Sequence, residues 1–330
     1  PFIPVLKSTG FSGGRIKMKK QNKKHSYVFW VMIAFIAALI AAPNASIAKL
    51  GITEVGASEY NVMRLSAGAV VGVVLILMGI KKFNVKNLTN SLLAGAFMTI
   101  ALITFVHAIK LSSAGYVAIL SLMAPINLVI ISRLWLKETI TKSATVGIFV
   151  AAIGALFAVI SVQGSNNLDF NNTNYLLATL IMFINTIVFP LSLIFARKAN
   201  KQNLPIYSVF GVIKIVGFFG SVAFLILTTK QPEFSVTPIS IVAAVYSGVI
   251  VMVVARILNV LSYEHLSSAT IGSFLYIESF MALLIIIFIV KEQVPLLLLV
   301  GGGTILLGVY LTQRDKMHIQ HYGLHTLRHH

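Results

Sequence analysis

Ten apolar stretches of about 20 residues, separated by short polar segments, occupy almost the whole of this 330-residue chain. An α-helix rises about 1.5 Å per residue, so each stretch can cross a hydrocarbon core of roughly 30 Å. The stretches are also too long and too uniformly apolar for the strands of a membrane barrel. The sequence therefore predicts an all-α integral membrane protein with ten transmembrane helices, near residues 28–50, 58–80, 88–109, 114–135, 143–163, 174–196, 206–229, 238–262, 268–290 and 294–312.

The composition agrees with this class and excludes several functions. The chain is 57% hydrophobic and only 11% charged, whereas soluble domains have about 25% charged residues. A net charge of +17 would suit a nucleic-acid ligand, but the basic residues lie between the apolar stretches instead of on one face. The absence of cysteine excludes disulfides and thiol chemistry. The histidines of the tail from His318 to His330 match no defined metal-site spacing, so we expect neither a metal nor a cofactor.

The distribution of Lys and Arg predicts the orientation. The two terminal segments and the loops on their side carry 19 Lys and Arg residues, against four in the opposite loops. Positive charge is enriched on the cytoplasmic side, so both termini are predicted to be cytoplasmic, in a cell inner (plasma) membrane. Residues 1–27 then form a basic cytoplasmic segment and residues 313–330 a cytoplasmic tail. Met18-Lys19-Lys20 resembles a natural start, which would make residues 1–17 either an upstream extension or a non-native addition.

The two halves of the chain share a sequence pattern. Each half has five predicted helices, an odd number, so the second half enters the membrane upside down. Residues 28–163 and 174–312 are therefore predicted to form two inverted five-helix repeats, with a binding site between them near the middle of the membrane. The matched residues are Leu111-Ser112-Ser113-Ala114 with Leu266-Ser267-Ser268-Ala269, Lys137-Glu138 with Lys291-Glu292, Gly147 and Gly154 with Gly301 and Gly308, and Pro43 with Pro190.

These motifs also resemble a known family. The stretch from His107 to Val117, with Ala124-Pro125, Leu136-Lys137-Glu138 and the glycines from Gly147 to Gly154, is similar to the second part of an EamA-type repeat of the drug/metabolite transporter superfamily. Residues from Tyr263 to Gly308 resemble it again, with Glu278-Ser279 in place of Ala124-Pro125. The resemblance covers about residues 28–312. It implies a ten-helix transporter of small organic metabolites that works by alternating access.

Four charged residues fall inside predicted helices, namely Arg64, Lys214, Arg256 and Glu278. A charge at the centre of a membrane helix costs about 2.5 kcal/mol or more. Glu278 lies too far from either helix end to reach water; it could bind a cationic group, carry a proton that couples transport, or serve only as a structural acid. Arg64 could hold a carboxylate or reach the outer interface beside Glu59. For Lys214 and Arg256 the sequence favours side chains that reach the interface.

Polar and aromatic side chains complete the predicted site. Asn44, Asn127 and Asn185 lie near prolines, which free backbone groups in helices, so these amides could line a cavity. Their alternative role is hydrogen bonding between helices, worth about 0.6 kcal/mol on average. Tyr116 and Tyr276 could stack on a ligand or simply pack between the repeats. The predicted substrate-binding residues are Asn44, Arg64, Tyr116, Asn127, Asn185, Tyr276 and Glu278, with Glu278 as the proton-coupling residue.

The function predicted from these features is secondary transport of small organic metabolites, such as amino acids, with export favoured by the resemblance. The sequence lacks the glycine-rich phosphate loop that would indicate ATP hydrolysis. It also lacks the pair of acids that would indicate an intramembrane enzyme. The alternative is a membrane receptor or scaffold with the same fold that transports nothing. The predicted partners are a small-molecule substrate, the lipid bilayer and protons, without nucleic acid, for a monomer or a homodimer.

Overall fold

A computed structural model describes residues 27–79, 88–124, 126–127, 130–131, 134, 142–163, 173–201, 204–234, 236–263, 268–291, 294–308 and 310–311. Within these ranges the ordered elements are helices and there is no strand, which agrees with the predicted all-α class. The predicted terminal segments, Pro125 and the side chain of Tyr276 lie outside the described residues.

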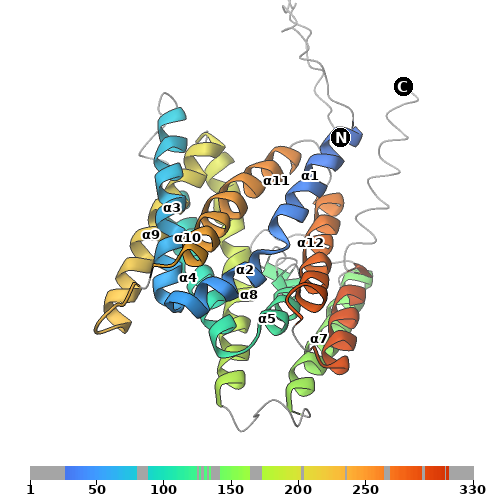
Figure 1. Ribbon diagram of the computed structural model, residues 1–330. Coiled ribbons are helices and arrows are strands. Elements are labelled where there is room, and N and C mark those ends of the chain that lie inside the picture. Colours follow the sequence, from blue (N-terminus) through green and yellow to red (C-terminus); the bar gives the residue numbers. More distant parts are fainter. Residues whose placement is uncertain are drawn as a thin grey trace, which may run out of the picture.

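The helices follow the apolar stretches of the sequence closely (Figure 1). They are α1 (Tyr27–Ala41), α2 (Asn44–Val55), α3 (Ala57–Met78), α4 (Thr89–Leu111), α5 (Ala114–Ser121), α7 (Lys142–Gln163), α8 (Thr173–Lys201), α9 (Ile206–Thr228), α10 (Pro238–Val245), the π-helix η3 (Tyr246–Ala255), α11 (Arg256–Tyr263) and α12 (Ser268–Phe288). A shorter apolar helix, Leu296–Gly308, follows them.

Six helical segments among the described residues are long and apolar enough to cross a membrane. They are Val28–Val55, Ala57–Met78, Thr89–Leu111, Asn174–Ala196, Tyr207–Thr228 and Pro238–Asn259. Thr145–Ala158 and Leu296–Gly308 are shorter apolar helices. The chain is therefore a multi-pass membrane protein, and the full set of ten spans stays a prediction.

Three predicted helices are interrupted. The first is divided by a turn at Ala42 and Pro43, because proline has no N–H for a helical hydrogen bond. The helix predicted at 114–135 is wrong as one unbroken element: α5 ends at Ser121, and tight bonds from Leu122 and Met123 to carbonyls three residues earlier form a turn. The helix predicted at 238–262 contains the π-helical segment η3, which widens the helix by one residue per turn.

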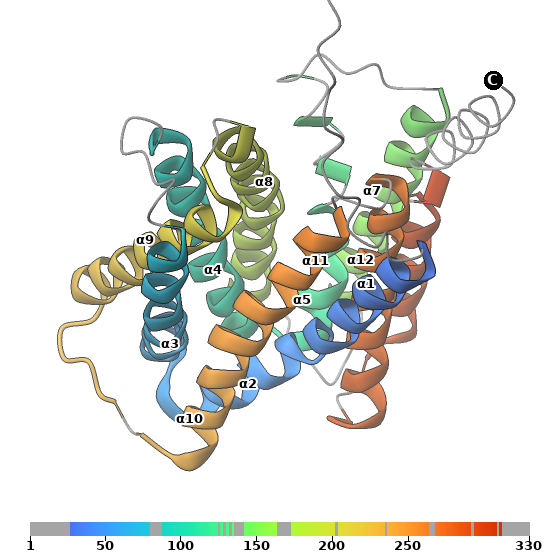
Figure 2. The same cartoon turned by 90° about the horizontal axis from the view of Figure 1, so that it is seen from above.

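The helices are arranged around a central crossing. α3, α4, α8 and α9 pack against one another on one side of the molecule, and α12, α7 and helix Leu296–Gly308 lie on the other (Figures 1 and 2). Between them, α1 packs against η3, α11 and α12, while α2 packs against α10. Segments from the beginning and the end of the chain are thus joined at the centre.

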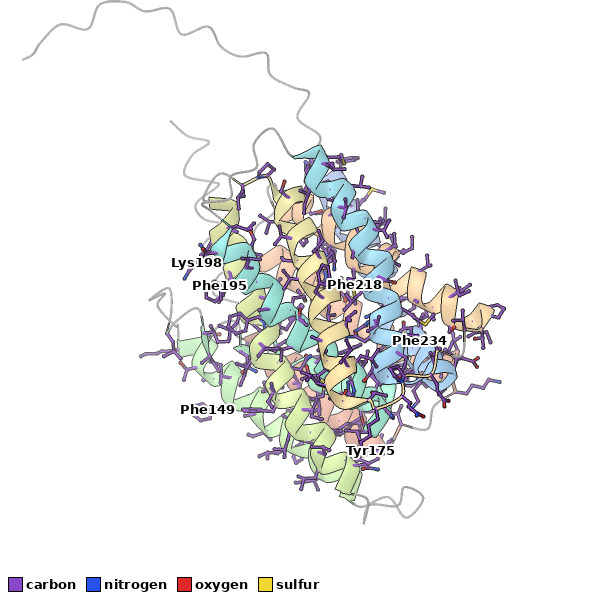
Figure 3. All side chains as sticks on the ribbon, turned by 90° about the vertical axis from the view of Figure 1, so that its left-hand side faces the viewer. Phe149, Tyr175, Phe195, Lys198, Phe218 and Phe234 are labelled. Atoms are coloured by element: carbon purple, nitrogen blue, oxygen red, sulfur yellow. The ribbon has the colours of Figure 1, made fainter. Side chains whose placement is uncertain are left out.

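The outer surface is apolar, as expected of helices in lipid. Many large hydrophobic side chains point outward; Phe149 of α7 is 67% exposed, and Leu227 at the end of α9 is 84% exposed. Figure 3 shows Phe149 projecting from the bundle on one face, and near another part of that face Lys198 lies beside Phe195, with its Nζ 5.1 Å from the ring centroid. A soluble protein would bury such side chains, so this surface suits a hydrocarbon environment.

Close helix packing depends on glycines at two crossings. Gly72 of α3 faces the backbone carbonyl of Gly211 of α9, a close approach of the kind that small residues allow between membrane helices. In the other crossing, a Cβ on Gly154 of α7 would lie 2.7 Å from the carbonyl oxygen of Gly301. These helices approach so closely that only glycine fits between the two backbones.

Replacing Gly248 with alanine is expected to lower the melting temperature of the purified protein. The new Cβ would collide with the backbone carbonyl of Arg64, and an overpacked site costs about 1–3 kcal/mol. Gly303→Ala is the matched control, because no atom lies within 4 Å of its Cβ position, and alanine favours a helix by about 1 kcal/mol over glycine. Equal melting temperatures for the two variants would show that α3 and η3 are not in contact.

Candidate functional site

A cavity of about 180 Å³ lies where the first helix is broken. Seven helices contribute to it, namely α1, α2, α4 and α5 from the first half of the chain and α8, α11 and α12 from the second. Seven of its fifteen lining residues are alanines, whose small side chains leave the space open. The lining consists of Ala41, Ala42, Asn44, Ala45, Ala101, Leu102, Phe105, Ala118, Ser121, Ala124, Asn185, Phe189, Arg256, Glu278 and Ala282.

Two charged side chains, Glu278 of α12 and Arg256 at the start of α11, are among these lining residues. The Oε2 atom of Glu278 is buried and has no hydrogen-bond partner among the described residues. The guanidinium carbon of Arg256 lies 5.5 Å from the ring centroid of Phe189, which also lines the cavity. Arg256 interacts electrostatically with Glu278, but no ion pair joins these two described side chains. The cavity therefore holds one acidic and one basic side chain that are not bonded to each other.

Two of the predicted amides reach this cavity. Asn44 follows the break at Pro43, and its Oδ1 accepts a hydrogen bond of 2.8 Å from the Ser247 hydroxyl. Asn185 donates to the carbonyl of Ala101 at 2.6 Å and to the hydroxyl of Thr104 at 3.0 Å. Both amides thus join helices of different halves as well as lining the cavity, so the two roles considered from the sequence occur together.

The prolines shape the surrounding helices in two ways. Tyr246 donates a hydrogen bond of 2.7 Å to the carbonyl of Ile40, in the last turn before the break. Pro190 lies inside α8 and does not interrupt it. Because Pro190 has no N–H, the carbonyl of Thr186 lacks its helical donor. The Nδ2 of Asn127 supplies a donor instead, at 3.1 Å from the Thr186 carbonyl and 2.9 Å from its hydroxyl.

Asn127 and Tyr116 therefore lie outside the cavity lining. Asn127 satisfies the helix around Pro190. Tyr116 is 1% exposed; its hydroxyl is 2.7 Å from that of Thr179, and its ring meets the ring of Tyr175 edge-on at 5.5 Å. In this conformation both side chains connect α8 with the first half of the chain, and neither lies on the cavity wall.

Arg64 lies behind the cavity wall and is completely buried. Its Nε donates to Oδ1 of Asn61 at 2.8 Å, and one terminal nitrogen donates to the carbonyl of Leu102, a lining residue, at 3.0 Å. Its other terminal nitrogen lies 3.5 Å from the Ser247 hydroxyl, which in turn donates to Asn44. Arg64 is therefore connected to the cavity through Ser247 and Asn44, and it does not extend to the outer interface.

Arg256 lines the cavity, although the sequence favoured a side chain that reaches the interface. Lys214 is also only 5% exposed and packs against Gly68 and Gly72 of α3. The sequence signal was present in both cases, because each is a basic residue within an apolar stretch. Their distances from the helix ends do not reveal which neighbouring helix they face.

Comparisons with known proteins support the fold and the class. Residues 28–160 match the EamA-like transporter family. Over 228 residues the chain is 22% identical to a protein named "Uncharacterized transporter YyaM" from Bacillus subtilis (strain 168), with 67% of this chain and 72% of that protein covered. The chain is also similar to a solved structure named only "Crystal structure of protein", with a TM-score of 0.60 and 14% sequence identity. The match covers 87% of this chain and 98% of the other.

Proposed function

We propose that this chain, of which residues 28–160 match the EamA-like transporter family, is a membrane transporter of that kind. It moves a small organic metabolite, such as an amino acid, across a cell membrane by alternating access. The cavity that contains Glu278 and Arg256 is the proposed substrate site. The observation that carries the proposal is that both halves of the chain contribute elements to this cavity. A site between two halves can be opened to either side of the membrane when one half moves against the other.

Helix contacts support the proposed inverted repeats. If α1–α2 correspond to α8, α3 to α9, α4 to α10–α11 and α5 to α12, most contacts between the halves have a counterpart. The packing of α4 on α8 matches that of α11 on α1 and of α10 on α2, and the packing of α5 on α8 matches that of α12 on α1. The contact of α4 with α9 likewise corresponds to that of α10 with α3.

The glycine crossing supports the same relation. A Cβ on Gly154 would contact the Gly301 carbonyl, and one on Gly308 would contact the Gly147 carbonyl. Exchanging the halves by the sequence match of Gly147 with Gly301 and of Gly154 with Gly308 converts the first contact into the second. This is the pattern that a twofold relation between the halves predicts.

Within this proposal, Glu278 carries the proton that couples transport to the proton gradient, and export is the physiological direction. Asn44 and Asn185 offer polar atoms to the substrate where the first helix is broken. Arg64, Tyr116 and Asn127 act by holding the helices around the site, and they contact substrate only if the conformation changes. Neither a cofactor nor a metal takes part, and the chain is not an enzyme.

The proposal is tested with purified protein in proteoliposomes. Pooled amino acids, nucleosides and amines are supplied with and without a proton gradient, and uptake of each is measured against empty vesicles. Transport of at least one pool, with its rate altered by the gradient, is the expected result. If no solute enters above the level of empty vesicles, in either direction of the gradient, the chain is a receptor or scaffold with this fold.

The proposed orientation predicts which cysteine variants are labelled from outside the cell. The natural chain has no cysteine, so Lys230→Cys and Lys142→Cys each carry a single thiol at an exposed position. A thiol reagent that cannot cross the membrane is expected to label position 230 in intact cells and position 142 only after the cells are opened. The reverse pattern would place both termini outside.

A further inference from the structure

We propose that the substrate of this site is a small organic acid with a hydrogen-bond donor near its carboxylate, bound by Arg256 at the carboxylate and by Glu278 at the donor. This inference rests on the proposed function and adds the chemical class of the substrate. It starts from the charges at the cavity. Arg256 and Glu278 are the charged residues of its lining, and they come from neighbouring segments of the second half.

The interior behind the cavity is rich in basic side chains. Lys214 is buried between α9 and α3 and interacts electrostatically with both Arg256 and Arg64. The described hydrogen-bond partners of Arg64 are neutral groups. Three basic residues, Arg64, Lys214 and Arg256, therefore interact in a region where charges need compensation, and one acid, Glu278, interacts with Arg256. A negatively charged substrate group would supply it.

Arg256 is the cation that can meet such a group directly. It lines the cavity, while Lys214 and Arg64 do not. Within the described ranges its guanidinium makes no hydrogen bond and lies beside the ring of Phe189. The guanidinium is planar, so its N–H donors point outward in one plane even when a ring lies beside it, and this fork matches the two oxygens of a carboxylate. The donors of Arg256 are thus available to a ligand.

Glu278 is the reason that the substrate needs a hydrogen-bond donor. A buried polar atom without a partner costs about 1–3 kcal/mol, and more when it is charged. The Oε2 of Glu278 is such an atom among the described residues. A hydroxyl or ammonium group on the substrate would donate to it. The ligand therefore needs a donor in addition to its carboxylate.

The volume limits the size of this ligand. An engineered cavity of about 150 Å³ holds benzene, so a cavity of about 180 Å³ holds a molecule of roughly six to eight non-hydrogen atoms by the same measure. Alanine and lactate satisfy all three requirements, namely size, carboxylate and donor. Propionate lacks the donor, propionamide lacks the negative charge, and propylamine lacks the carboxylate.

Binding is measured as the shift in melting temperature of the full chain in detergent, since a ligand that binds only the folded state stabilises it by an amount that rises with the logarithm of ligand concentration over the dissociation constant. Alanine or lactate is expected to give the largest shift and propionate a smaller one, while propionamide and propylamine give none. The proposal is overturned if no carboxylate stabilises the protein, or if the amide or the amine does so as strongly.

Variants assign the contact. Arg256→Gln is expected to weaken binding of the best carboxylate by at least about 30-fold, because it leaves a buried charge of the complex unpaired. Arg256→Lys, which keeps the charge, is expected to retain part of the affinity and the fold. Lys110→Gln, at an exposed position, is the control and should bind normally. Unchanged binding by Arg256→Gln contradicts the assignment.

The two proposals fail in different ways. Binding of carboxylates that depends on Arg256, without transport of any solute in proteoliposomes, would remove the transport proposal and leave the recognition of organic acids intact. Transport of an amine or a neutral solute that is unaffected in Arg256→Gln would remove the recognition of organic acids and leave the transport proposal intact.

Discussion

Replacing Glu278 with glutamine is expected to abolish accumulation of substrate driven by a pH gradient, while exchange of substrate between equal concentrations continues. Glutamine has nearly the same shape as glutamate but cannot release a proton. Glu278 is the acid on the cavity wall, so the variant should retain the fold and lose the coupling. The measurement is uptake of the substrate identified in proteoliposomes, at equal pH and with an imposed gradient.

The control for this prediction is Glu59→Gln, which makes the same chemical change in the first turn of α3, away from the cavity lining. It should accumulate substrate as the natural chain does. If Glu278→Gln also accumulates substrate at the normal rate under a gradient, Glu278 has no part in coupling. If both variants fail equally, the loss comes from a general effect of removing negative charge.

Much of the fold could be predicted because the membrane imposes a simple rule on the sequence. Apolar stretches of about 20 residues predicted most helix positions to within a few residues, and Pro43, singled out because proline frees a backbone group, lies at the break in the first helix. The π-helix at Tyr246–Ala255 was not predictable. It depends on contacts such as that of Gly248 with the carbonyl of Arg64, between residues far apart in the sequence.

The same distinction holds for the candidate site, where some residues could be predicted from the local sequence and others depend on contacts between distant residues. Glu278 could be identified from sequence, because a central acid in an apolar helix has no route to water. Asn44 and Asn185 were identified from their nearness to prolines. Asn127 carried the same signal, yet it bonds to the backbone near Pro190. Arg256 was missed as a lining residue, since its role depends on the direction it faces and on the position of Phe189.

Replacing Arg64 with methionine is expected to cause a large loss of stability, about 2–4 kcal/mol, through the unsatisfied Oδ1 of Asn61 and the space left by the guanidinium. Asn61 is only 1% exposed and its amide already donates to Ser221 of α9 at 2.8 Å. Arg64 thus belongs to a chain of bonds that joins α3 to α9, to α4 through Leu102 and to η3 through Ser247. The measurement is the melting temperature of the purified protein.

Arg64→Lys separates charge from geometry in this network. Lysine keeps the positive charge, but its single ammonium lacks the fork that reaches Asn61 and Leu102 together. If the hydrogen bonds matter more than the charge, Arg64→Lys loses stability as well. Ser66→Ala on the same helix is the control and should change the stability by less than about 0.5 kcal/mol, because the Ser66 hydroxyl bonds only locally to the carbonyl of Met63. Full stability of Arg64→Lys would mean that the charge alone is needed there. Since Leu102 lines the cavity and Ser247 bonds to Asn44, a weakened network should also reduce substrate binding, which couples the stability of the bundle to the shape of the site.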